Sequence, residues 1–193
     1  MSLPKIKEED RFSYADYLTW DDEKRWELID GEAICMSPGP NRLHQKWLGE
    51  LFVQFHTHLD GKPCEVFLAP FDVRLPDHAN ATDEEIVTVV QPDIMVVCDP
   101  DKIDDRGVNG APDLVIEIIS PSTAKRDITT KYDLYQRHGV KEYWLVYPND
   151  RTLLVYRLTE TGKYSQPDVF GEADSVPVPL LGDLIVEMGN VFK

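Results

Sequence analysis

Two carboxylates stand in runs of otherwise apolar residues. Asp93 precedes the run Ile94–Val97, and Glu117 lies inside the run Leu114–Ile119. Because neither run alternates with polar residues, both are typical of strands covered on both faces. An unpaired ionised carboxylate there would cost several kcal/mol, and a divalent cation shared by both acids would offset that cost. The pattern predicts a metal site; alternatively, each acid lies at a strand end and reaches water or an arginine.

A lysine follows Glu117 on the next expected element. A polar turn leads from this strand into a helix expected over 124–138. Asp127, Lys131 and Tyr135 recur at four-residue spacing, so Lys131 should border the face that packs on the sheet. The alternative is that Lys131 only pairs with Asp127 on a solvated face, for about 0.3–0.5 kcal/mol. The side chains expected to mark the packed face are Ile128, Tyr132 and Tyr135.

The preceding segments provide the framework for these acids. A turn at Asp30-Gly31 predicts a hairpin over 25–36. Asn41 should cap a long helix over 42–59, and His44 falls on the apolar stripe of that helix. On such a stripe a histidine is more often a hydrogen-bonded core residue than a ligand. The other expected elements are strands over 64–75 and 86–97, a polar loop over 99–112, and a hairpin over 141–158.

The order helix, strand, strand, strand, helix, strand predicts an α/β fold with a mixed sheet flanked by helices. The length of 193 residues fits one domain. We expect N-terminal helices and a hairpin in 1–40, a core in 41–147, and C-terminal edge strands in 148–193. The net charge of −15 argues against tight, unassisted binding to a phosphate backbone, although a local basic rim can coexist with an acidic body.

The three cysteines, Cys35, Cys64 and Cys98, are an odd number without CxxC spacing. Disulfide scaffolding and a zinc knuckle are therefore not expected, and a reducing cytoplasm is the simplest setting. The first ten residues lack the apolar core of a signal peptide. No run approaches the roughly 20 apolar residues that a membrane-spanning helix needs.

The chain resembles the PD-(D/E)xK nuclease superfamily, which has the restriction endonuclease-like fold, and more narrowly the Uma-two family of restriction endonucleases. The blocks that carry the resemblance are Trp26–Gly31, His44, Gln91-Pro92-Asp93, Glu117–Thr123, Lys131–Tyr135 and His138–Val146. Together they span most of the chain. The block from Glu117 to Val146 is the most specific of them.

The resemblance implies a Mg²⁺-dependent endonuclease acting on DNA, with Mn²⁺ as a substitute metal. Its metal ligands would be Asp93, Glu117 and the backbone carbonyl of Ile118. The superfamily lysine normally stands two residues after the glutamate, where this chain has Ile119. The resemblance therefore implies that Lys131 is the migrated lysine, which would orient the attacking water or the phosphate.

Two further residues and a dimer follow from the same resemblance. His44 matches a helper from the first core helix, and Glu27 matches a position of the Uma-two pattern. Cutting both DNA strands needs two sites, so a homodimer is expected. The displaced lysine and the acidic charge also allow an inactive protein that keeps the fold and acts as a binding or assembly module. A basic groove beside Glu117 favours the nuclease, and a uniformly negative cleft favours the module.

Overall fold

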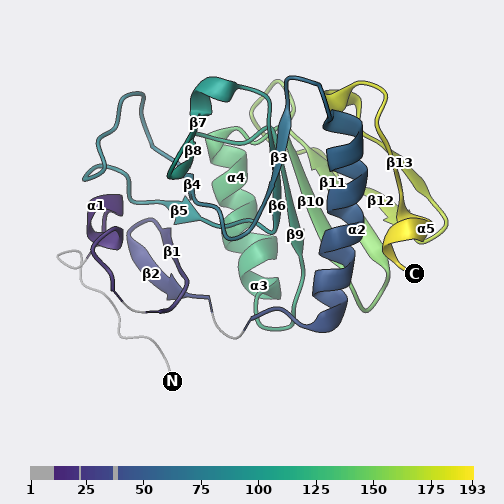
Figure 1. The fold of residues 1–193 in the computed structure, drawn as a ribbon, viewed down its shortest axis with the longest axis horizontal. Helices are drawn as coiled ribbons and strands as arrows, with labels where there is room; N and C mark the ends of the chain where they lie inside the picture. Colours follow the sequence, from purple (N-terminus) through teal and green to yellow (C-terminus); the bar gives the residue numbers. More distant parts are fainter. Residues whose placement is uncertain (1–10, 22, 37–38) are drawn as a thin grey trace.

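The computed structural model describes residues 11–21, 23–36 and 39–193 (Figure 1). The expectation about the first ten residues falls outside them. Within the described residues, the strands form two six-stranded sheets and one two-stranded sheet. The mixed α/β class expected from the sequence is therefore confirmed, and the second six-stranded sheet was not foreseen.

The core sheet has the order β12-β11-β10-β9-β6-β3. β9 and β10 run parallel, whereas β3, β6, β11 and β12 pair antiparallel with their neighbours. Every residue of β6 and β9 is buried, as the two unbroken apolar runs predicted. The bounds of these strands are β3 Glu65–Leu68, β6 Ile94–Val97, β9 Leu114–Ile118, β10 Glu142–Tyr147, β11 Thr152–Arg157 and β12 Asp168–Gly171.

Helices cover both faces of this sheet (Figure 1). One face packs on α2 (Arg42–Leu59), which Asn41 caps by accepting a hydrogen bond from a backbone N–H. The same apolar cluster includes β13 (Ser175–Pro177), β14 (Ile185–Glu187) and α5 (Met188–Val191). Across the described part of the chain, no helix combines the length and apolar character needed to cross a membrane.

The second sheet and α4 (Tyr132–His138) pack against the opposite face of the core sheet. Its order is β2-β1-β5-β4-β8-β7. The strand bounds are β1 Trp26–Ile29, β2 Glu32–Cys35, β4 Val73–Arg74, β5 Val89–Val90, β7 Ile103–Asp104 and β8 Gly107–Asn109. The hairpin over 25–36 is confirmed as β1 and β2, with Asp30 and Gly31 both at positive φ.

Two of the expected strands are each divided between the sheets. The segment 64–75 contributes β3 to the core sheet and β4 to the second sheet, with a cis bond before Pro70 between them. The segment 86–97 contributes β5 to the second sheet and β6 to the core sheet. Pro92 lies between β5 and β6 and lacks the N–H that would continue a ladder. The expected loop over 99–112 contains the short hairpin β7–β8.

The helix expected over 124–138 contains an irregular turn. It consists of α3 (Ala124–Arg126), a π-helical turn (Asp127–Lys131) and α4 (Tyr132–His138). The wider turn rotates the buried face, so Asp127 and Lys131 are buried whereas Ile128 is 40% exposed. The expectation that Ile128 packs on the sheet was wrong. Gly139 ends α4 at φ +83°.

A disulfide joins Cys64 to Cys98, with the two Cα atoms 3.9 Å apart, and Cys35 is a free thiol. The expectation that the cysteines would not form a disulfide was wrong. β3 and β6 pair antiparallel with Glu65 opposite Val97, and this register brings the next residues along, the two cysteines, together. The cysteine pattern therefore no longer argues for a reducing compartment.

Candidate active site

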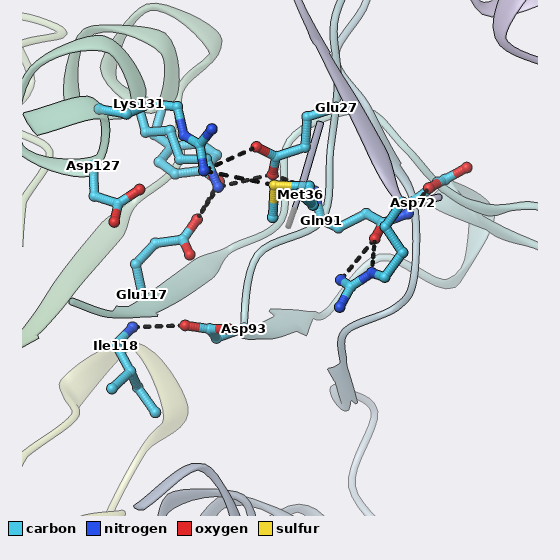
Figure 2. Close-up of polar contacts among 12 residues, drawn as sticks. Glu27, Met36, Asp72, Gln91, Asp93, Glu117, Ile118, Asp127 and Lys131 are labelled. Atoms are coloured by element: carbon cyan, nitrogen blue, oxygen red, sulfur yellow. Dashed lines mark hydrogen bonds and ion pairs between the residues drawn. The ribbon is translucent and has the colours of Figure 1, made fainter. Parts of the chain in front are cut away.

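Lys131 lies between two carboxylates that come from different sheets (Figure 2). Its Nζ donates to Oε1 of Glu27 on β1 and to Oε1 of Glu117 on β9, at 2.8 Å in both cases. Lys131 is only 1% exposed, and both glutamates are buried. The expected position of Lys131 beside the packed face is thus confirmed, and the surface pair with Asp127 is excluded as its main role.

The two glutamates have further donors that fix their positions. The Tyr135 hydroxyl on α4 donates to Oε1 of Glu117 at 2.9 Å. The backbone N–H of Gln91 donates to Oε1 of Glu27 at 2.9 Å. Oε2 of Glu27 is buried without a hydrogen-bond partner in the described residues, and Nη2 of Arg126 lies 3.9 Å from it. The cluster therefore joins the strand β1, the strand β9 and the helical segment that follows β9.

Burial dominates the electrostatics of the cluster. Desolvation raises the pKa of Glu117 to about 8, against the opposing effect of the Lys131 charge. Desolvation alone would lower the pKa of Lys131, but the charges of Glu117 and Glu27 outweigh it and hold that pKa above its usual value. Burial also raises the pKa of the Asp127 carboxyl. Lys131 therefore stays charged at neutral pH, while Glu117 readily takes up a proton or another cation.

Asp93 lies beside this cluster but has its own partners. Its Oδ2 accepts a hydrogen bond from the backbone N–H of Ile118 at 2.8 Å and lies 3.0 Å from Nε2 of His44 on α2. Figure 2 shows the Asp93 carboxylate directed at Ile118 and the Glu117 carboxylate directed at Lys131. The Asp93 charge contributes to the raised pKa of Glu117, so the two acids interact electrostatically. Among the described residues, His44 contacts Asp93 and Lys131 contacts Glu117, and no arginine bonds to either acid.

Gln91 connects Glu27 to the segment that carries Asp93, and the sequence alone indicated no role for Gln91. Its backbone N–H holds Glu27, and Asp93 follows it by two residues. Its side chain accepts from Arg25 at 2.8–3.0 Å and donates to Asp72 at 2.8 Å and Tyr17 at 3.3 Å. The only signal available was its place in the block Gln91-Pro92-Asp93. Tyr135 could have been found, because it shares the four-residue spacing with Lys131.

The chemistry of these donors fits a hard divalent cation. Carboxylates outnumber the ammonium group around Glu117, since Asp127, Asp93 and Glu27 all raise its pKa. Hard cations prefer such oxygen donors, and the orphaned Oε2 of Glu27 adds an unsatisfied one. Within the described ranges, however, no three His, Cys, Asp or Glu side chains already converge as a metal-binding group. The residues fit the ion in type, while Lys131 and Tyr135 occupy Oε1 of Glu117.

The six predicted site residues fall into two hydrogen-bonded groups. Glu27, Glu117 and Lys131 form one hydrogen-bonded group. His44 and Asp93 form a second group, which the backbone N–H of Ile118 completes. Ile118 was expected to contribute its carbonyl, and its role as a ligand stays a prediction.

Known proteins resemble this chain over most of its length. An uncharacterized protein, slr1290 of Synechocystis sp., is 28% identical over 157 residues, which cover 80% of this chain and 78% of that protein. A crystal structure described as a putative nuclease belonging to DUF820, from Anabaena variabilis, has a TM-score of 0.72. The alignment covers 94% of this chain and 97% of that one at 24% identity, which is a likeness of fold. Residues 14–189 match the Uma2 family, described as "Putative restriction endonuclease", and the chain therefore belongs to that family.

Proposed function

We propose that this protein is a metal-dependent endonuclease that hydrolyses phosphodiester bonds of DNA. The observation that carries the proposal is the buried Lys131 ammonium held by Glu27 and Glu117, with Asp93 beside them. Membership of a family described as restriction endonucleases supports it. Perturbed, buried titratable groups of this kind gather at functional sites more often than elsewhere.

Asp93 and Glu117 would hold Mg²⁺ or Mn²⁺, together with the carbonyl of Ile118. The bound metal would supply an activated water and stabilise the charge that develops on the phosphate. Lys131 has three N–H donors and uses two of them on Glu117 and Glu27. No described residue accepts from its third N–H, which would orient a water or a phosphate oxygen.

His44 positions the metal ligand Asp93, and Glu27 positions Lys131. His44 fixes the carboxylate of Asp93 from the α2 side, through its Nε2. Glu27 holds the Lys131 ammonium from the β1 side, so the lysine keeps one anchor when Glu117 accepts a cation. Both residues are therefore positioning groups in this proposal.

The test is cleavage of plasmid DNA by the full chain with Mg²⁺ or Mn²⁺. Asp93→Asn and Lys131→Met should each lower the rate about 100-fold or more, because each removes a charge that acts on the transition state. Lys163→Ala removes an exposed lysine that has no place in the proposed site and should leave the rate unchanged. Equal rates for the wild type and Asp93→Asn would refute the metal mechanism.

A second candidate function is a binding or assembly module without catalysis. It is favoured by the engagement of Glu117 with Lys131 and by the lack, in the described residues, of a ready three-ligand group. In that case, purified protein would cut neither DNA nor RNA with any divalent metal. Calorimetric titration would then give the same weak Mg²⁺ binding for the wild type and Asp93→Asn.

The nuclease proposal also includes a homodimer, because cutting both strands of a duplex needs two sites. Light scattering coupled to size-exclusion chromatography gives the mass directly. A particle of twice 22.1 kDa is expected. A monomer that still linearises plasmid DNA would contradict the dimer and leave the site chemistry intact.

A further inference from the structure

A pocket of about 550 Å³ opens between the β1–β2 hairpin and the helical segment that carries Lys131. Three basic residues line it: Arg11, Lys125 and Arg126. Such a concentration of positive charge is unusual in a chain whose net charge is −15. The volume lies within the range of about 300–1,000 Å³ that is typical of ligand pockets.

The basic groups of this pocket lack strong partners in the described structure. No side-chain hydrogen bond or ion pair to a described residue holds the Arg11 guanidinium or the Lys125 ammonium. Among the described residues, Nε of Arg126 is buried without a hydrogen-bond partner, and its Nη2 lies 3.5 Å from Sδ of Met36 and 3.9 Å from Oε2 of Glu27. Other arginines pair closely with acids: Arg74 with Asp104, Arg106 with Asp83, and Arg151 with Glu172.

The remaining polar groups of the pocket suit an anion. Of its two acids, Asp30 is paired with Arg137, so its charge is already opposed, and Glu32 is outnumbered by the three basic residues. Three hydroxyls also line the wall, from Ser122, Thr129 and Thr130. Hydroxyls, an ammonium and guanidinium groups are the donors that contact phosphate oxygens in nucleic-acid complexes.

The pocket adjoins the candidate active site. Ile29 in its wall and Glu27 in the site lie two residues apart on β1, so they share one face of the strand. Thr130 in its wall directly precedes Lys131. Arg126 belongs to both, since it lines the pocket and approaches Oε2 of Glu27.

We infer that this pocket binds a backbone phosphate of the nucleic-acid substrate, next to the phosphate that is hydrolysed. The inference rests on the proposed nuclease function, and it adds a binding site for the substrate backbone to that function. It also accounts for how an acidic protein can bind DNA, because the local charge of the pocket is opposite to that of the whole chain. Arg126 would link the bound backbone to Glu27.

The test separates binding from cutting. Binding of a fluorescein-labelled DNA duplex of about 20 base pairs is measured by anisotropy in EDTA over a range of salt concentrations. Lys125→Ala and Arg11→Ala should each raise Kd roughly five- to tenfold at low salt and lower the salt slope by about 0.9 per lost contact. Lys163→Ala removes the same charge as Lys125→Ala from a position that does not line the pocket, and Lys125→Arg conserves the charge. Both of these controls should bind like the wild type.

The outcomes distinguish the two claims. If the wild type cuts DNA but Lys125→Ala and Arg11→Ala bind like Lys163→Ala, the pocket inference is overturned and the nuclease proposal stands. If the wild type cuts no DNA with Mg²⁺ or Mn²⁺ yet its binding depends on Lys125 and Arg11, the pocket is supported and hydrolysis fails. If the wild type does not bind the duplex even at low salt, the pocket inference is overturned.

Discussion

Replacing Lys131 by methionine tests the buried cluster most directly. Methionine has nearly the length of lysine and fills its space without the charge. The substitution removes one hydrogen bond of 2.8 Å from Glu27 and another from Glu117, both of which are buried. Removing one partner of a buried ion pair typically costs about 3–5 kcal/mol, because the remaining charge is left uncompensated.

The expected cost of Lys131→Met depends on pH. Burial already raises the pKa of Glu117 to about 8 with the lysine present, and the loss of the lysine would raise it further. A carboxyl whose folded pKa lies above its unfolded value stabilises the fold at low pH, and this contribution is lost as pH rises through the folded pKa. We therefore expect the free energy of unfolding to fall by about 3–5 kcal/mol near pH 9 and by less near pH 6.

The assay is urea unfolding followed by tryptophan fluorescence, at both pH values. Lys125→Met changes an exposed lysine of the same helical segment and should cost less than about 0.5 kcal/mol. Combining Lys131→Met with Glu117→Gln should cost less than the sum of the single changes, because the uncompensated charge is removed. A cost for Lys131→Met below about 1 kcal/mol at both pH values would show that the lysine is not buried between the carboxylates.

Three further predictions follow from the same contacts. Tyr135→Phe should lower the free energy of unfolding by about 1.5–3 kcal/mol, since its hydroxyl donates to Glu117; no loss in urea unfolding would contradict that bond. Mg²⁺ binding at pH 7 should release protons and should become tighter as pH rises to about 8, because the metal requires an ionised Glu117. Calorimetry in buffers of different ionisation enthalpy measures this proton release, and finding none would contradict the prediction. Thiol titration of the denatured, unreduced protein should find one free thiol, and three would exclude the disulfide between Cys64 and Cys98.

The central strands β6 and β9 of the core sheet could be predicted from the sequence because each lies in an unbroken, largely apolar run. The runs around Asp93 and Glu117 are buried on both faces, so they lack the alternation of a half-exposed strand. The second sheet could not be predicted in the same way. Its strands β4, β5 and β7 have two residues each, which is too short to show any period.

The site could be predicted only in part, because some of its contacts join residues that are far apart in the sequence. Spacing along one helix placed Lys131 near the packed face, but its partner Glu27 lies 104 residues away and depends on how the hairpin docks. The π-helical turn that exposes Ile128 has no compositional signal of its own. The register that joins Cys64 to Cys98 likewise becomes visible only when β3 and β6 are paired.

In the proposed metal mechanism, the position of Glu27 explains how one lysine can serve a site that would also accept a cation. If Glu117 were its only partner, a cation on Glu117 would leave the Lys131 ammonium buried and unpaired, which is a costly state. Glu27 prevents this, because its Oε1 holds the same ammonium and is itself fixed by the backbone N–H of Gln91. Since Asp93 follows Gln91 by two residues, one short segment positions both the anchor of the lysine and the second acid. Glu27, Glu117, Asp93 and Lys131 are therefore coupled electrostatically, and a change of charge on Glu117 alters the electrostatic energy of the other three side chains.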